Sequence, residues 1–240
     1  MRILALITAR GGSKRLPGKN IRLLGRKPLV VWSIDVVSGI PEICDVLVST
    51  DDNLIAAVCS EAGAYVPWLR PAELATDTAS SVAVALHALD WYEAEKGPVD
   101  GLLLLQPTSP FRTHSSVQQG IDLFVQHSHK PVLGVSATHA HPMWTLRIDA
   151  DYLVPFLGGH GIGTRSQDLP PAYVVNGCFY LISPTELRAG RSFLGVRTVP
   201  LFIESPLEML DIDTEWDFKI AEMLIEKFGD NLITKKNHVC

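Results

Sequence analysis

The segment that decides the fold stands near the start of the chain and reads ILALIT at residues 3–8, followed by ARGGSKRLPGKN at residues 9–20. A short apolar run that ends at a glycine-rich turn predicts a buried strand. Three glycines let the backbone of the following loop approach a ligand closely. The loop also carries four positive charges: Arg10, Lys14, Arg15 and Lys19. A basic, glycine-rich loop directly after a strand predicts a polyphosphate site.

The spacing within this loop excludes two well-known phosphate-binding motifs. It is not a P-loop, because Asn20 stands where a Ser or Thr would hold Mg²⁺. It is not a Gly-x-Gly-x-x-Gly dinucleotide loop either. The alternative is a solvated basic turn. A position at the carboxyl end of the first strand, where ligands bind in open α/β sheets, favours the phosphate site.

Strands and helices alternate along most of the chain. The pattern predicts strands at 3–8, 45–50, 64–67, 101–105, 132–136, 174–182 and 196–202, and helices at 28–37, 53–62, 78–95, 115–127 and 214–228. This order predicts an α/β fold, a three-layer Rossmann-like arrangement with a mostly parallel sheet and helices on both faces. The loops after Thr8, Thr50, Leu105 and Ser136 would then share the binding edge.

One stretch breaks the rhythm. Residues 139–171 are rich in Gly, His and Pro and contain only short extended pieces. We interpret the chain as a single domain, 1–240, from which 139–171 leaves the core as a projection or lid. His139 and His141 lack a third metal ligand nearby, so a solvated or substrate-facing pair is expected. Residues 230–240 are expected to form a loosely held tail.

Composition excludes several classes of function. The net charge of −5 provides no general attraction for nucleic acid. The four cysteines form no Cys-x-x-Cys pair, so structural zinc is not expected. No stretch of about 20 apolar residues is present, and the short apolar start does not have the pattern of a signal peptide. We therefore expect a cytoplasmic protein that binds neither nucleic acid nor membranes.

A second chemical signal is Asp-Ile-Asp-Thr at 211–214. In an extended stretch, residues two apart share a face, so Asp211 and Asp213 point the same way while Ile212 enters the core. Two hard oxygen ligands suit Mg²⁺ that bridges to phosphate. The alternative is that Asp213 or Thr214 caps the last helix, which leaves Asp211 unexplained.

Three further segments offer candidate binding residues. Arg70 precedes a predicted helix that Asp77 and Thr78 would cap, with Ser80 in its first turn. Gln106 follows a buried strand and can both donate and accept hydrogen bonds, as the recognition of a pyrimidine or of sugar hydroxyls requires. Asn176 is a candidate substrate ligand. A capped helix and an ordinary turn are the simpler interpretations of the first two.

Taken together, these motifs resemble those of the CMP-sialic-acid synthetases, or N-acylneuraminate cytidylyltransferases. The resemblance runs through most of the chain and rests on ordered motifs at 9–20, 49–51, 69–81, 104–112, 167–170, 176–180 and 211–214. It implies a fold of the nucleotide-diphospho-sugar transferase type, a homodimer, and 139–171 as a dimerisation segment. The implied reaction joins CMP from CTP to an acidic nine-carbon sugar, with Mg²⁺ as cofactor and release of pyrophosphate.

The resemblance also implies roles for individual residues. Arg10, Ser13, Lys14 and Lys19 would bind the CTP phosphates, in a loop where Gly12 and Asn20 also belong to the nucleotide site. Arg70, Ser80 and Gln106 would surround the nucleotide or sugar, and Asn176 would contact substrate. Asp211 and Asp213 would hold Mg²⁺. Arg10, Lys19 and Asp211 would be catalytic, and two roles are open for Asp211, as metal ligand or as general base.

The chain departs from the family pattern at two places near the expected sugar pocket. Trp144 replaces a basic residue often found after His-Pro, and Val174-Val175 stand in place of Arg-Pro before Asn176-Gly177. Two fewer cations predict a less polar pocket. N-acetylneuraminate is the leading sugar, with deoxygenated relatives such as legionaminic or pseudaminic acid as alternatives. Arg165 or Arg147 would then bind the sugar carboxylate.

Three other functions share some of these sequence features. A CMP-Kdo synthetase, which acts on an eight-carbon acidic sugar, also has a basic loop after its first strand, but the motifs at 77–81 and 211–214 favour the sialic-acid family. A non-catalytic CTP-binding regulatory module would not need the acidic pair. A phosphatase would carry its Asp-x-Asp directly after the first strand, whereas here the pair precedes the last helix.

Overall fold

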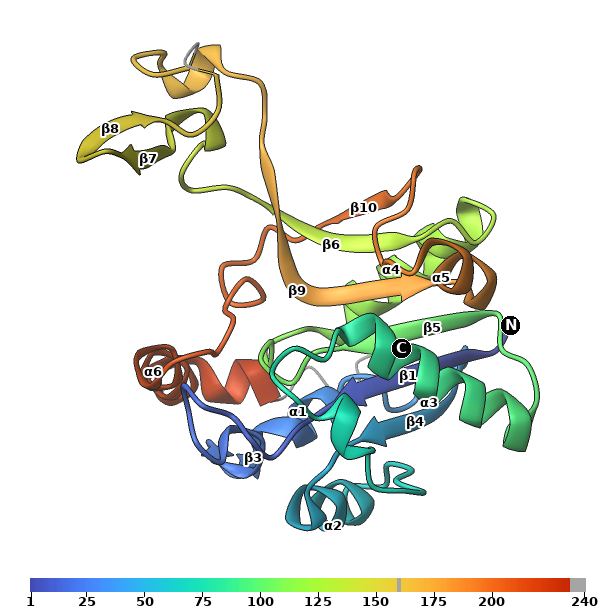
Figure 1. Cartoon of the computed structure of the whole chain (residues 1–240). Coiled ribbons are helices and arrows are strands. Elements are labelled where there is room, and N and C mark those ends of the chain that lie inside the picture. The colour runs from blue at the N-terminus through green and yellow to red at the C-terminus, as the bar shows by residue number, and fades with distance from the viewer. Residues whose placement is uncertain (159–160, 234–240) are drawn as a thin grey trace.

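The computed structural model describes residues 1–158 and 161–233 of the chain. Its main sheet has six strands in the order β10-β6-β9-β5-β1-β4 (Figure 1). Their bounds are β1 Ile3–Thr8, β4 Ile43–Ser49, β5 Gly101–Leu105, β6 Val132–Ala137, β9 Tyr173–Ile182 and β10 Val199–Phe202. β1 pairs in parallel with β4 and β5, and β10 with β6, whereas β9 is antiparallel to both of its neighbours. The predicted α/β fold with a mostly parallel sheet is confirmed.

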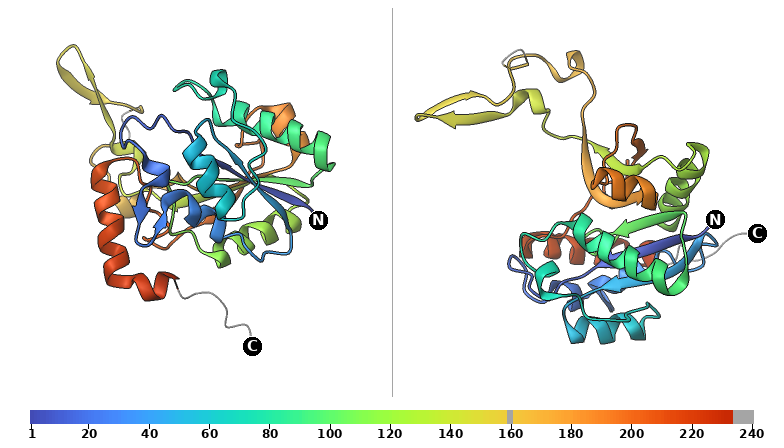
Figure 2. Two further views of the ribbon diagram at one scale, coloured as in Figure 1. Left: turned by 90° about the horizontal axis from the view of Figure 1, so that it is seen from below. Right: turned by 45° about the vertical axis from the view of Figure 1, so that its right-hand side comes forward.

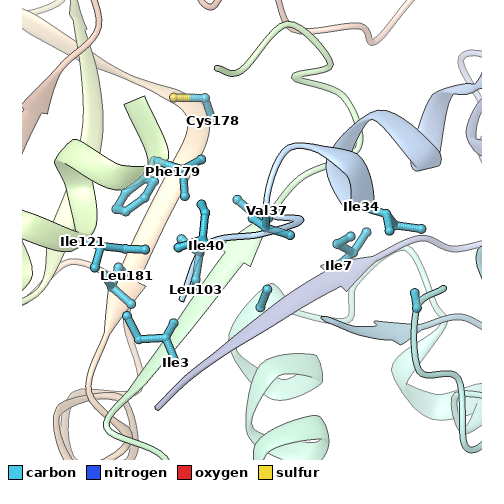
Figure 3. Packing of buried hydrophobic residues seen from close by; sticks show 14 of the residues in the cluster. Ile3, Ile7, Ile34, Val37, Ile40, Leu103, Ile121, Cys178, Phe179 and Leu181 are labelled. Carbon is cyan, nitrogen blue, oxygen red and sulfur yellow. The ribbon is translucent and has the colours of Figure 1, made fainter. Parts of the chain in front are cut away.

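Helices cover both faces of this sheet. Along β1, Ile3, Ala5 and Ile7 pack into one apolar cluster with three helices, α1 (Leu29–Asp35), α2 (Asn53–Glu61) and α4 (His114–Gln126) (Figure 3). The alternate residues Leu4 and Leu6 pack into a second cluster with α3 (Ser81–Lys96) and α5 (Pro184–Gly190). Because both faces of the strand are buried, its sequence is apolar throughout.

A third apolar cluster joins the two segments that carry the chemical motifs. It contains Leu16 of the basic loop, Ile212 of the acidic segment, and Phe218 of the last helix, α6 (Glu215–Ile233). Leu24 of the short β2–β3 hairpin (Leu23–Leu24 and Lys27–Pro28) packs in the same cluster. The packing of apolar side chains therefore brings residues about 200 positions apart to one place.

Several element boundaries differ from the predictions. The long helix begins at Ser81 rather than at Thr78, because Ser80 caps it and Asp77 is held by other partners. The predicted strand at 64–67 is reduced to single bridges at Tyr65 and Leu69. Helix α5 was not predicted.

The C-terminal part differs as well. β10 begins at Val199 rather than at Val196. α6 continues to Ile233, so the expectation of a loose tail from Asp230 is wrong for its first residues, and 234–240 lie outside the described residues.

Residues 138–172 leave the sheet between β6 and β9 and form a separate projection (Figure 2). It contains a two-stranded antiparallel hairpin, β7 (Leu146–Asp149) and β8 (Tyr152–Pro155), flanked by the 3-10 turns η3 (Pro142–Trp144) and η4 (Ser166–Asp168). Both views show the hairpin standing away from the body. Whether this segment dimerises or covers a site remains a prediction.

Within 1–158 and 161–233, none of the helices is long and apolar enough to cross a membrane.

Candidate active site

The basic loop after β1 is held in shape by bonds to its own residues and to the loop after β4. The backbone N–H of Gly11 donates to Asp51 Oδ1 at 3.0 Å, and a Cβ on Gly11 would lie only 2.7 Å from Asp52 Oδ2. Asn20 is buried, and its Nδ2 donates to the backbone carbonyl of Arg10 at 2.9 Å. The glycine is therefore required by close approach, and Asn20 braces the loop.

The four cations of this loop divide into two pairs, each held by one carboxylate. Arg10 lies 3.0 Å from Asp77 Oδ1, and Lys14 contacts the other oxygen of Asp77. Arg15 lies 2.9 Å from Asp213 Oδ2, and Lys19 lies 3.2 Å from Asp213 Oδ1. The loop therefore stands between two acidic partners that come from different parts of the chain.

Lys19 links the basic loop directly to the acidic segment before α6. Its Nζ donates to the backbone carbonyl of Ile212 at 2.9 Å as well as to Asp213. Its side chain is only 12% exposed, whereas that of Arg15 is 70% exposed. Lys19 is therefore held in one place, and a phosphate bound by it would lie beside Asp211 and Asp213.

Burial alternates along the acidic segment, with Ile212 between the more exposed Asp211 and Asp213. Ile212 is fully buried, and its N–H donates to the backbone carbonyl of Thr108 at 2.8 Å, in the loop after β5. Thr214 caps α6: its Oγ1 accepts from the N–H of Asp217 at 3.3 Å, and the Asp217 carboxylate accepts from the N–H of Thr214 at 2.7 Å. The backbone N–H of Asp213 also donates to Asp217 Oδ2 at 3.1 Å, so this capping box leaves only the carboxylates of Asp211 and Asp213 outside the cap.

Asp211 differs from Asp213 in its partners. In the described ranges, no cation lies within ion-pair distance of Asp211. Asp211 keeps contact with solvent, yet the protein around it desolvates its carboxylate, and this desolvation is the main reason why its pKa is raised. The charge of Asp213 raises this pKa further, while a hydrogen bond with Thr108 and the charge of Lys19 oppose the rise.

Asp211 and Asp213 are the candidate metal ligands. Across residues 1–158 and 161–233, no group of three or more His, Cys, Asp or Glu side chains comes together. Two carboxylates with hard oxygens still fit Mg²⁺, since this ion often takes one or two protein carboxylates and completes its shell with phosphate oxygens and water. The residues thus fit a metal that is shared with a phosphate ligand.

Three predicted binding residues line the neighbouring loops. Arg70 is buried, its Nε donates to Ser49 Oγ at 2.9 Å, and a second N–H bonds the backbone carbonyl of Ser49. Burial lowers the pKa of Arg70 to about 10. Ser80 Oγ accepts from the N–H of Ala83 at 3.1 Å as the cap of α3. Gln106 directly follows β5, and its Oε1 lies 3.1 Å from where a Cβ on Gly177 would stand.

Asn176 and Arg165 are placed differently from these loops. Both ends of the Asn176 amide are used internally, Nδ2 donating to Ser136 Oγ at 3.0 Å and Oδ1 accepting from the N–H of Cys178 at 3.2 Å. Arg165 lies on the projection and pairs with Asp168 at 2.9 Å, while Arg147 pairs with Asp149 at 3.0 Å. Arg165 therefore belongs to the projection, whose hairpin stands away from the body (Figure 2).

Three residues that organise the site were assigned no role from the sequence: Asp51, Arg112 and Glu208. Asp51 holds the basic loop, as described above, and Asp77, which was expected to cap a helix, instead pairs with Arg10 and Lys14. Buried Arg112 bonds the backbone carbonyls of Cys178 and of Gln106, the latter at 3.1 Å. Buried Glu208 accepts from the N–H of Thr113 at 2.7 Å. Glu208, a charged residue between Leu207 and Met209, was the available signal.

Comparisons with known proteins identify the family of the chain. The model of the cytidylyltransferase family matches residues 4–129, from β1 through α4. The chain is 38% identical to the CMP-N,N'-diacetyllegionaminic acid synthase of Legionella pneumophila subsp. pneumophila, over 97% of this chain and 100% of that protein. It is 33% identical to an N-acylneuraminate cytidylyltransferase of Streptococcus agalactiae serotype III, covering 99% of this chain but 56% of that longer protein. The chain therefore belongs to the cytidylyltransferase family, and it is a nucleotidyltransferase.

Further similarities support the family and the fold. A pseudaminic acid cytidylyltransferase of Campylobacter jejuni is 30% identical over 93% of this chain and 96% of that protein. The solved structure of a CMP:2-keto-3-deoxy-manno-octonic acid synthetase superposes with a TM-score of 0.68 at 16% identity, over 95% of this chain and 99% of that one. The resemblance to CMP-sialic-acid synthetases is confirmed at the level of the family.

Proposed function

We propose that this protein transfers the cytidylyl group of CTP to the anomeric hydroxyl of an acidic nine-carbon sugar, with Mg²⁺ and with release of pyrophosphate. One observation carries the proposal: Lys19 joins the basic loop to the acidic segment, so phosphate-binding cations and candidate metal ligands form one site. The relatives named above for CMP-sugar synthesis support the class of sugar.

The geometry supports a direct displacement. The anomeric oxygen attacks the α-phosphorus, the bond to the bridging oxygen of pyrophosphate breaks, and the hydroxyl proton passes to a base or to solvent. Arg10, Lys14 and Lys19 would neutralise the phosphates and hold them in line, which is most of what phosphoryl-type transfer requires. Among the described residues, Asp211 has no ion-pair partner, and it is the candidate general base of the site.

Mg²⁺ would be held by Asp211 and Asp213 together with phosphate oxygens of CTP. When bound there, the ion would supply charge neutralisation and lower the pKa of a coordinated hydroxyl. Lys19 and Arg15 occupy Asp213 in the described structure, so they must shift toward the phosphates for Asp213 to become a ligand. Asp211 would be the anchor of the pair.

For the sugar, we propose a less polar nonulosonic acid of the legionaminic kind. A cavity of about 370 Å³ at the base of the projection is lined by Trp144, Tyr173 and Pro170, among others. Val174 and Val175 at the start of β9 are half exposed beside Tyr173. These apolar side chains suit a sugar in which hydroxyls are replaced by hydrogen or acetamido groups. The 38% identity to the legionaminic enzyme agrees with this choice.

We also propose a homodimer in the cytoplasm, where CTP is available. Ile148, Tyr152, Leu153 and Phe156 of the projection are between 63% and 75% exposed. Ile148 and Leu153 are paired across the hairpin and share one face, whereas Tyr152 lies on the other, so apolar side chains are exposed on both faces. A two-stranded hairpin of this size is marginal alone, and exposed apolar surface of this kind marks an interface. A second copy that covers the hairpin would also bring its Arg165 toward another site.

The decisive experiment measures pyrophosphate release from CTP and Mg²⁺ with N-acetylneuraminic, N,N'-diacetyllegionaminic, pseudaminic and Kdo sugars. Release with the diacetylated sugar and little with the others would support the proposal in full. Release with another nine-carbon sugar would keep the reaction and change the substrate. Release with Kdo only would move the protein to the eight-carbon class, and CTP binding without any release would indicate a regulatory module.

The role of Arg165 has its own test within the same assay. Arg165→Met should raise the KM for the sugar about tenfold or more and leave CTP binding unchanged, because it would remove a charge-assisted bond to the sugar carboxylate. Arg147→Met, on the same projection, is the matched control. An effect confined to Arg147 would exchange the two assignments.

A further inference from the structure

The basic loop binds a carboxylate from another segment of the chain, that of Asp77. Asp77 contacts both cations of the first half of the loop, Arg10 at 3.0 Å through one carboxylate oxygen and Lys14 through the other. The guanidinium of Arg10 also donates to the backbone carbonyl of Thr76 at 3.1 Å. The two oxygens of this carboxylate accept from the same arginine and lysine that would bind two oxygens of a phosphate group.

Asp77 is charged in this position. The hydrogen bond from Lys14 is the main reason why the pKa of Asp77 is lowered, and the charge of Arg10 lowers it as well. Asp77 lies in the segment between the 3-10 turn η2 (Ala72–Leu74) and α3, just before the cap Ser80. It is therefore attached to a loop that also carries predicted nucleotide-binding residues.

The shape of the basic loop does not depend on Asp77. Its backbone is fixed by other residues, by Asp51 at the N–H of Gly11 and by Asn20 at the carbonyl of Arg10. The Lys14 side chain is 78% exposed and that of Asp77 is 45% exposed. Ion pairs between such exposed groups are weak, so a polyphosphate with several charges can displace the carboxylate.

We infer that Asp77 is an internal competitor for the polyphosphate, which occupies Arg10 and Lys14 in the empty site and takes them back when pyrophosphate leaves. This inference rests on the proposed function and deepens it. Asp77 would weaken the binding of both CTP and pyrophosphate. A weaker grip on pyrophosphate favours release of the product, and product release limits the turnover of many enzymes.

The test compares Asp77→Asn with the wild type in calorimetric titrations with inorganic pyrophosphate and with CTP at low salt. Asp77→Asn should bind both ligands about two- to fivefold more tightly, the range expected when exposed ion pairs are removed. The gain should shrink as NaCl is raised. Pyrophosphate should also become a stronger product inhibitor by a similar factor.

Two matched variants separate competition from other effects. Asp90 is a comparable exposed aspartate that lies on α3 and pairs with Arg188 at 2.6 Å. Asp90→Asn should leave both affinities unchanged. Asp77→Glu keeps the charge and should stay close to the wild type. Equal or weaker binding by a folded Asp77→Asn would overturn the inference and make Asp77 an orienting residue. If the wild type itself binds neither pyrophosphate nor CTP, the proposed function fails, and this inference fails with it.

Discussion

The basic loop and the projecting segment are held by the chain in opposite ways. The loop is fixed by bonds to two other segments, through Asp51 and Lys19, and by a bond within the loop from Asn20. In 139–171, by contrast, Gly161 is the only buried residue among those that the structure describes. The first region makes its contacts within one chain, whereas the second exposes apolar side chains. Under the proposed function, phosphate binding would need only one chain, and sugar recognition would depend on a second copy.

The largest effect is expected at the acidic segment. Asp211→Asn should lower kcat roughly 10²–10³-fold, the scale found when one electrostatic group of a transition state is removed. The measurement is pyrophosphate release at saturating CTP and sugar, over a range of Mg²⁺ concentrations. Asp90→Asn, on the surface of α3, is the control. Turnover near that of the wild type would remove Asp211 from the metal site.

The same variant also tests the electrostatics of the folded state. Because folding raises the pKa of Asp211, its charged form opposes folding above that pKa, and this penalty disappears as the pH falls below the unfolded value. Asp211→Asn should therefore melt at an equal or higher temperature than the wild type at pH 7–8, with the difference fading in acid. A marked loss of stability at neutral pH would show that the carboxylate is needed for the fold.

The second effect separates two cations that share one carboxylate. Lys19→Met should reduce kcat/KM about 100-fold, because Lys19 is nearly buried and bonds both Ile212 and Asp213. Arg15→Met should reduce it only a few-fold, because an exposed ion pair contributes little. Steady-state kinetics with CTP as the varied substrate gives both values. Equal losses would mean that the loop acts through its total charge and that burial does not distinguish its members.

Much of this site could be predicted from the sequence, because local rules govern it. The apolar run of β1, the glycines after it and the alternation of Asp211, Ile212 and Asp213 all have meanings that depend on neighbours in the chain. The pairing of Asp77 with Arg10 could not be predicted in this way. It joins residues from different loops. Because Asp77 pairs with Arg10, it does not cap a helix, and α3 begins at Ser81 rather than at the predicted Thr78.

The same limit explains the rest of the fold. The apolar run at 174–182 predicts a buried strand, but a run buried on both faces does not specify direction, and β9 is antiparallel to β5 and β6. Arg112 and Glu208 are buried through contacts with distant backbone groups, so their roles depend on the assembled structure. Local pattern predicts elements, and long-range contacts decide their partners.

The third effect concerns the projection. Ile148 and Leu153 are directly paired across the hairpin, so Ile148→Lys with Leu153→Glu removes the apolar face while keeping a favourable cross-strand pair. The double variant should be monomeric in light scattering and should lose sugar turnover while still binding CTP. Leu194→Lys with Val196→Glu changes exposed apolar residues elsewhere and should leave the assembly intact. A dimeric hairpin variant would place the interface on another surface.

The smallest effect is expected at the cap of α6, which touches the acidic segment only through the backbone N–H of Asp213. Thr214→Ala removes the cap of α6 and should lower stability by about 1 kcal/mol, or roughly 2–4 °C in melting temperature. Activity should change little, because Lys19 and Arg15 hold the carboxylate of Asp213, and the bond from Ile212 to Thr108 fixes the backbone. Thermal melting and turnover of the same preparation measure both. If turnover falls with the melting temperature, the cap itself positions the acidic pair. The site joined by Lys19 would then depend on α6 as well as on the contacts of the loop after β1.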